Sequence, residues 1–218
     1  MRGLLRFWDS TIGKKVVMAV TGLGLVVFVV GHMAGNLQVF LGADVFNDYA
    51  HSLQALGPLL WIARGLLLVA VVLHIISAAQ LTARARAARP DDYAKREPQV
   101  STWASRTMRI GGVLLALFIV LHIQHMTIGN LHPAFSRGGA YGNVILGFRS
   151  WWVTLFYVVA MGFLGLHLFH GVWAGFRSLG LAKPNPMPLE RTLALWVALI
   201  VWAGFTVVPV AVWLGLVN

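Results

Sequence analysis

The sequence contains no cysteine, which excludes disulfides, thiolate metal sites, Cys-ligated iron–sulfur clusters and covalently attached c-type haem. Charged residues are also scarce, at 11% of the 218 residues, against roughly 25% in an average soluble domain. Hydrophobic residues make up 58% of the chain, which is more than a soluble domain of this size can bury. The composition therefore excludes an ordinary cytosolic enzyme, a disordered chain and a fibrous protein.

Five long apolar segments account for most of the chain. A membrane-spanning helix needs about 20 mainly apolar residues. Segments of this kind lie at about residues 14–41, 58–81, 106–131, 151–179 and 189–216. The loops that join them are too short to form a soluble domain. The sequence therefore predicts an all-α membrane protein with five transmembrane helices, in a single membrane domain over residues 1–218.

The positive charges are distributed unevenly between the two sides of the predicted membrane domain. Of the 17 Lys and Arg residues, only Arg64, Arg137 and Arg149 fall on one side, and the other fourteen fall on the opposite side. Cytoplasmic loops carry an excess of Lys and Arg, so we expect a cytoplasmic N-terminus and a C-terminus outside. Because these charges lie in short loops, they favour contact with anionic membrane lipid or a docked partner over nucleic acid.

The predicted spans contain histidine, but no Asp or Glu lies in their interior. A proton pump or cation transporter usually needs a buried acid, so this absence disfavours such a protein. Four consecutive spans carry a histidine in their C-terminal half, namely His32, His74, His122 and His167. Neighbouring spans run antiparallel and a helix rises about 1.5 Å per residue. We therefore expect His32 and His122 near the outer face of the membrane core, and His74 and His167 near its inner face.

Each of these two pairs is suited to ligate a haem iron. Haem iron takes axial ligands from both sides of the macrocycle, and histidine is a standard choice. We predict two b-type haems, each with two histidine ligands, in a haem-binding bundle formed by four of the five helices. The alternative role for a membrane histidine is a hydrogen bond between helices, but four at matched depths are harder to explain in that way. Zinc is disfavoured, because no Cys or carboxylate lies nearby to complete a site.

Two further histidines, His125 and His170, lie in the third and fourth spans. Each follows a proposed ligand by three residues, on roughly the same face of its helix. Each is therefore an alternative ligand, or a donor to a haem propionate or a quinone, or a packing residue. We prefer His122 and His167 as ligands, because a leucine precedes the histidine in three of the four spans.

A weak internal repeat supports the same choice. Gly22 and Gly112 stand ten residues before His32 and His122. Small residues near the histidines leave room for a flat group between helices, although they also permit close helix packing without any ligand.

Several motifs together resemble the b558 family of succinate:quinone oxidoreductase subunits, which are single-chain, dihaem, five-helix cytochrome b membrane anchors. The resemblance covers nearly the whole chain. The motifs that carry it are Ile12-Gly13-Lys14-Lys15, Thr21-Gly22, residues 31–37 (GHMAGNL), residues 46–51 (FNDYAH), Leu73-His74, Leu121-His122 and residues 167–173 (HLFHGVW).

The resemblance implies that His74 and His167 ligate an inner haem, and that His32 and His122 ligate an outer one. It also implies a bacterial inner-membrane protein that anchors the flavoprotein and iron–sulfur subunits of succinate dehydrogenase on the cytoplasmic face. Succinate oxidation, a step of the tricarboxylic acid cycle, takes place in the flavoprotein, so this chain holds no succinate site. Its own role is to pass electrons between the iron–sulfur subunit and a membrane quinone, usually menaquinone.

Three residues on the outer side are candidates for contacts with the quinone or with a haem propionate. His51 and Gln54 are candidate quinone ligands, because they lie in or near the matched 46–51 segment. Some relatives carry an acidic residue near the position of Gln54, and the glutamine here puts that proton-handling role in doubt. Arg64 looks buried, and an Arg suits a haem propionate. The alternative for Arg64 is an anchor at the membrane interface.

Two other functions remain open from the sequence. The chain is alternatively a haem b subunit of another membrane dehydrogenase or hydrogenase, which the co-purifying partner would reveal. A haem-free small transporter is the other alternative, and it predicts a colourless protein that still folds when His32 or His74 is replaced by Ala.

Overall fold

The computed structural model describes residues 2–88, 103–182 and 189–218. Within these ranges the chain is helical and has no strand. In chain order the elements are α1 (Arg2–Asp9), α2 (Thr11–Leu37), a 3₁₀ turn (Gln38–Leu41), α3 (Ala43–Ala55), α4 (Pro58–Ala87), α5 (Trp103–Ile123), a π-helical turn (Gln124–Ile128), α6 (Ala140–Phe148), α7 (Trp151–Ser178) and α8 (Leu189–Trp213).

Five of these helices are long and apolar enough to cross a membrane, which confirms the predicted all-α membrane fold. The five candidate spans are Thr11–Leu41, Pro58–Ala87, Trp103–Ile128, Trp151–Ser178 and Leu189–Trp213. The second span continues six residues past its predicted end, because residues 82–87 are rich in Ala and Arg, which favour the helix. The loop expected between the second and third spans, at residues 82–105, falls largely at residues 89–102, which lie outside the described residues. The loop between the fourth and fifth spans contains Pro184, Pro186 and Pro188, and residues 183–188 also lie outside the described residues.

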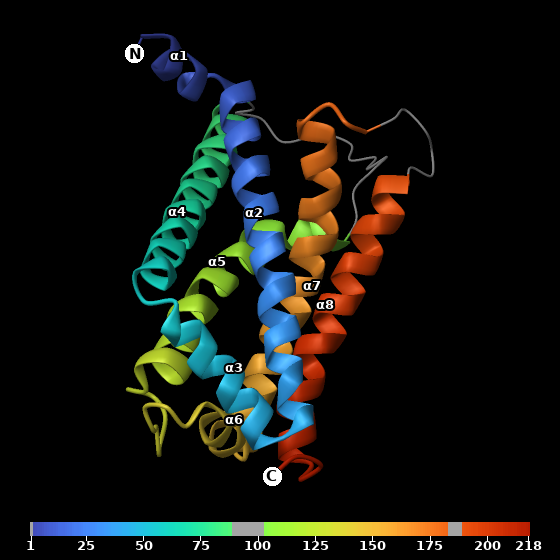
Figure 1. The fold of residues 1–218 in the computed structure, drawn as a ribbon. Helices are drawn as coiled ribbons and strands as arrows, with labels where there is room; N and C mark the ends of the chain where they lie inside the picture. The colour runs from blue at the N-terminus through green and yellow to red at the C-terminus, as the bar shows by residue number, and fades with distance from the viewer. Residues whose placement is uncertain (1, 89–102, 183–188) are drawn as a thin grey trace.

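The two ends of the chain lie at opposite ends of the bundle (Figure 1). The short helix α1 lies at one end, and the C-terminus lies at the other together with α3 and α6. Ser10 begins α2, because its side chain accepts a hydrogen bond from the backbone N–H of Gly13 at 2.8 Å. Pro58 occupies the first turn of α4, where its missing N–H costs no helix bond.

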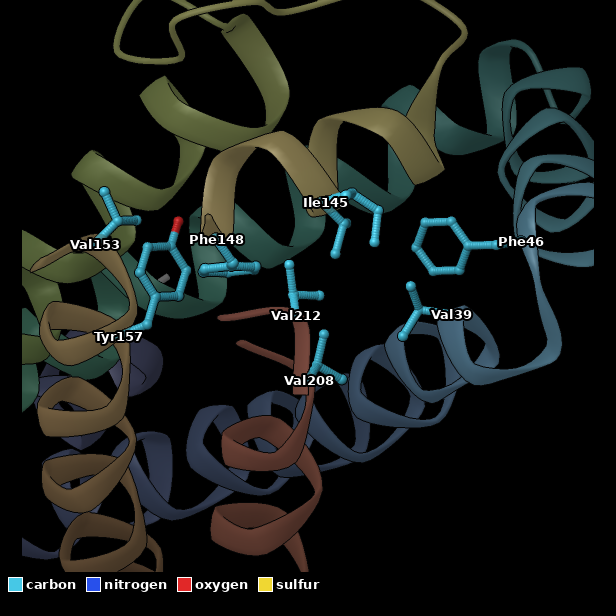
Figure 2. Close-up of a cluster of buried hydrophobic side chains, with 9 residues drawn as sticks. Val39, Phe46, Ile145, Phe148, Val153, Tyr157, Val208 and Val212 are labelled. Carbon is cyan, nitrogen blue, oxygen red and sulfur yellow. The ribbon is translucent and has the colours of Figure 1, made fainter. Parts of the chain in front are cut away.

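The helices α3 and α6 are absent from the sequence prediction and cover one end of the bundle. Asn47 of α3 joins them, because its Oδ1 accepts a hydrogen bond from the backbone N–H of Tyr141 at 3.0 Å. Beneath them lies the larger apolar cluster of the protein (Figure 2), whose buried members are Val39, Phe46, Val144, Ile145, Phe148, Val153, Tyr157, Val208 and Val212. The best-packed part of the described core is therefore at this end and not midway along the spans.

The long helices pack unequally. The helix α7 packs closely on α8, α5 and α2, and α2 also packs on α4 and α8. By contrast, α4 packs closely on α2 alone among the described long helices, and Ser77 is its only buried residue. The helices α2, α4, α5 and α7 carry the histidines of the two predicted pairs. The helix α8 packs on α2 and α7, where its Ala198 and Val201 form a second buried cluster with Met33 and Leu168.

Candidate functional site

Two pairs of histidines face each other between helices, as the depth argument predicts. His74 of α4 faces His167 of α7, with ring centroids 6.2 Å apart. His32 of α2 faces His122 of α5, with ring centroids 5.9 Å apart. We call these the inner pair and the outer pair; the outer pair is nearer to α3 and α6.

The imidazole of His74 is held by the backbone of α2. Its Nδ1 atom lies 3.1 Å from the carbonyl oxygen of Met18 and 3.4 Å from Oγ1 of Thr21. A carbonyl oxygen only accepts hydrogen bonds, so Nδ1 carries the ring proton and Nε2 keeps its lone pair. Gly22 makes room for the ring, since a Cβ at this position would lie 3.1 Å from Cε1 of His74. The ring is thus fixed in the tautomer that a metal ligand needs.

His167 completes the inner pair from the opposite side. Its Nδ1 is buried and has no hydrogen-bond partner among the described residues. Gly112 of α5 lies at the same level, because a Cβ there would be 3.9 Å from Cε1 of His167. In contrast to His74, no hydrogen bond to Nδ1 fixes the tautomer of His167 within the described residues.

Aromatic rings enclose the outer pair. His32 stacks on Phe28 with centroids 5.4 Å apart, and Phe205 of α8 lies 5.7 Å from it. His122 stacks on Phe118 at 5.6 Å. The Nδ1 atom of His122 lies 3.2 Å from Oη of Tyr157. The two imidazoles of the outer pair are thus packed among aromatic rings.

The geometry of both pairs fits a haem. An imidazole nitrogen lies about 2 Å from the metal it binds, so two axial nitrogens are about 4 Å apart and their ring centroids about 6 Å apart. The centroid separations of 6.2 and 5.9 Å match this value. In the described part of the chain, the helices within each pair, α4 with α7 and α2 with α5, are not among those that pack closely. The imidazoles of each pair therefore meet between two helices that do not pack closely on each other.

Within the described residues, no group of three or more His, Cys, Asp or Glu could hold a bare metal ion. Two protein ligands are enough for a haem iron, because the macrocycle supplies the other bonds. The two histidine pairs therefore fit a haem iron better than a metal ion held by protein ligands alone.

A comparison with known families identifies the chain at the family level. The model of the succinate dehydrogenase/fumarate reductase transmembrane subunit matches residues 82–207. The chain belongs to this family. Comparisons with curated proteins and with solved structures give no significant match. The matched region includes His122 and His167, one histidine of each pair, whereas His32 and His74 precede it.

A second histidine cluster adjoins the outer pair of this transmembrane subunit. His125 is buried, and its Nδ1 lies 3.0 Å from the same Tyr157 hydroxyl. His132 stacks on His125 with centroids 5.1 Å apart. The Nε2 of His132 donates to the carbonyl oxygen of Asn143 at 2.8 Å, and its Nδ1 accepts from the backbone N–H of Ala134 at 3.1 Å. Both nitrogens of His132 are occupied, so this residue is structural. Sequence reasoning alone misses both His132 and Tyr157.

A cavity of about 370 Å³ opens beside this cluster. Its lining includes His125, Asn130, His132, Ser150 and Trp152. Leu131, Pro133 and Val153 add apolar side chains to its walls.

His170, unlike His125, has no hydrogen bond on its Nδ1 atom. This atom of His170 is buried and has no partner among the described residues. It is His167, however, that faces His74. The ligand role of His167 and the polar role of His170 remain predictions.

The other predicted site residues lie on the surface. His51 and Gln54 are exposed on α3, so their proposed contact with a quinone remains a prediction. The prediction of a buried Arg64 is wrong: Arg64 is exposed, and its guanidinium stacks on Trp61 at 4.9 Å from the ring centroid. Amphipathic Arg and Trp side chains suit a membrane interface, which is the alternative role for Arg64.

A buried cation lies at the opposite end of the subunit. Lys14 is only 2% exposed. Its ammonium group donates to Oε1 of Gln80 and lies 4.3 Å from the ring centroid of Trp8. The neighbouring Lys15 is exposed. Lys14 therefore ties α2 to α4 at the end where the basic residues of the chain gather.

Proposed function

We propose that this transmembrane subunit is a dihaem cytochrome b that passes electrons between an iron–sulfur subunit and a membrane quinone. The observation that carries the proposal is the presence of two facing imidazole pairs with centroid separations of 6.2 and 5.9 Å. His74 and His167 would hold one haem b, and His32 and His122 the other. Each haem iron, when bound, carries one electron by changing between its ferric and ferrous states.

The chain's own residues orient these ligands. The carbonyl oxygen of Met18 holds the proton on Nδ1 of His74, so Nε2 would be the nitrogen that holds the haem iron. Tyr157 occupies the same position on His122. Phe28 and Phe118 stack on the two imidazoles of the outer pair, and apolar surroundings of this kind are one of the features by which a protein would set a haem potential.

The basic end of the bundle is the proposed docking surface for the flavoprotein and iron–sulfur subunits. Lys and Arg concentrate on cytoplasmic segments, so we assign the end that carries α1 to the cytoplasm and the C-terminus to the outside of a bacterial inner membrane. Described residues of this basic surface are Lys15, Arg84, Arg86, Arg109, Arg177 and Arg191. Succinate chemistry would take place in the docked flavoprotein, and this subunit would supply no catalytic residue to it.

The quinone would bind at the end of the bundle near the outer pair, and menaquinone is the form that the b558 resemblance favours. A quinone needs apolar walls and donors for its carbonyl oxygens. His51 and Gln54 on α3 supply polar groups on the surface, and the cavity beside His125 supplies polar groups between apolar walls.

The proposal is tested in the purified full complex by adding succinate and following the visible spectrum. Succinate should reduce both b haems, and a short-chain naphthoquinone added afterwards should reoxidise them. Replacing His167 by Ala should remove one haem and slow quinone reduction by more than tenfold, whereas His170→Ala should retain both haems. Haems that dithionite reduces but succinate does not would contradict the proposal, as would haem loss in His170→Ala alone.

A further inference from the structure

One hydroxyl group connects two histidines at the outer pair. Oη of Tyr157 lies 3.2 Å from Nδ1 of His122 and 3.0 Å from Nδ1 of His125. Tyr157 is buried, and its ring is held edge-on by Phe118 and Phe148, at centroid distances of 5.1 and 4.8 Å. Figure 2 shows Tyr157 beside Phe148 at one end of the apolar cluster. The packing leaves the hydroxyl fixed between the two imidazoles.

A phenol hydroxyl has a single proton, so it donates to only one of the two nitrogens. It must accept a hydrogen bond from the other. When both imidazoles are neutral, one of them therefore has its proton on Nδ1 and the other has its proton on Nε2. The shared hydroxyl gives His122 and His125 opposite tautomers.

The proposed iron ligation fixes which histidine has which tautomer. Tyr157 covers Nδ1 of His122, so Nε2 is the nitrogen available to the iron, and Nδ1 must then carry the ring proton. His122 donates to Tyr157, and Tyr157 donates in turn to His125. The proton of His125 is then on Nε2, which makes no hydrogen bond within the described part of the chain. His125 also lines the 370 Å³ cavity.

We propose that Tyr157 is the positioning residue of the outer pair: it fixes His122 as an Nε2 ligand, polarises that ligand, and orients His125 through one directional hydrogen-bond chain. The inference rests on the proposed dihaem function. An acceptor on the far nitrogen raises the basicity of a ligating imidazole. A more basic ligand favours the ferric state, so Tyr157 lowers the reduction potential of the outer haem.

The inner pair offers an internal comparison. There the acceptor on Nδ1 of His74 is the backbone carbonyl of Met18, and no second imidazole shares it among the described residues. A side-chain substitution therefore removes the acceptor at the outer pair only, and the inner haem serves as a reference in the same molecule.

The experiment is a redox titration of the full complex, followed by visible absorbance, with Tyr157→Phe. The matched control is Tyr141→Phe, which removes a hydroxyl that donates to the carbonyl oxygen of Asn218 at 3.1 Å. We expect two haems per chain in both variants. In Tyr157→Phe the midpoint potential of one haem should rise and the other should stay unchanged, while Tyr141→Phe should leave both unchanged. Two retained haems with unshifted potentials would overturn the proposal.

A second variant separates a connected chain from independent contacts. His125→Phe removes the acceptor of Tyr157 but leaves the hydroxyl able to accept from His122. It should shift the same potential in the same direction by a smaller amount. The double variant with Tyr157→Phe and His125→Phe should shift this midpoint potential no further than Tyr157→Phe alone. Additive shifts would show that the two residues act separately and would overturn the proposed hydrogen-bond chain. A wild-type complex without haem would instead refute the proposed function itself.

Discussion

Gly22 of α2 lies directly against the imidazole of His74 on α4. A Cβ at this position would lie 3.1 Å from Cε1 and 3.4 Å from Nδ1 of the histidine. The ring has little freedom to move away, because its Nδ1 is bonded to the carbonyl oxygen of Met18. The absence of a side chain at Gly22 therefore sets the position of a proposed haem ligand on the neighbouring helix.

Gly22→Ala should displace the ring of His74 by a few tenths of an ångström. We expect weaker binding of the inner haem, seen as less than two haems per chain or as an altered low-spin signal from one of them. Gly24→Ala is the matched control, because nothing lies within 4 Å of the Cβ it would add. The measurement is haem content together with the electron paramagnetic resonance spectrum. Equal spectra for both variants would mean that Gly22 does not position His74.

Lys14→Ala should destabilise the subunit. It leaves Oε1 of Gln80 without its donor and removes the ammonium group from the ring of Trp8. An unsatisfied buried polar group costs about 1–3 kcal/mol. Lys15→Ala, at an exposed neighbouring position, should change the stability by no more than about 0.5 kcal/mol. Thermal unfolding of the detergent-solubilised complex compares the two, and a larger loss in Lys15→Ala would contradict the structural role of Lys14.

His51→Ala and Gln54→Ala separate the two candidate quinone positions. If the quinone binds at α3, each substitution should raise KM for a short-chain naphthoquinone several-fold while the complex keeps two haems per chain. Ser52→Ala is the control, since its exposed hydroxyl bonds only to the carbonyl oxygen of Tyr49 among the described residues. An unchanged KM in both variants, together with a raised KM in His125→Phe, would place the quinone in the cavity beside His125 instead.

The spans and the pairing of the histidines could be predicted from the sequence, because both depend on helix length and rise. Ten residues separate Gly22 from His32 on α2 and Gly112 from His122 on α5, which corresponds to about 15 Å along a helix. The structure explains this spacing, since Gly22 lies against His74 and Gly112 lies near His167. Each glycine is level with a histidine of the inner pair.

The same spacing could have pointed to Tyr157 but not to its role. Tyr157 precedes His167 by ten residues, and Arg64 precedes His74 by ten. At 3.6 residues per turn, ten residues place a side chain about 80° around the helix from the histidine, so Tyr157 and Arg64 are placed in the same way relative to their histidines. Tyr157 meets His122 because α7 packs on α5, whereas Arg64 is exposed on α4, which packs closely on α2 alone among the described long helices. What a side chain meets thus depends on how the helices pack.

The short helices α3 and α6 could not be predicted in the same way. Each is shorter than a span, at 13 and 9 residues, and short apolar runs between spans have no clear periodicity. The buried position of His132 follows from α6, because its Nε2 bonds to the carbonyl oxygen of Asn143. Because α6 could not be predicted from the sequence, the buried position of His132 could not be predicted either.

The most direct test of the central claim is the number of haems per chain in single histidine variants of the full complex. The account predicts two b haems in the wild type, and one in His74→Ala and in His32→Ala, with the remaining haem differing in spectrum between the two variants. A variant that keeps both haems would show that its pair is assigned wrongly. A folded wild-type complex without haem would contradict the account as a whole.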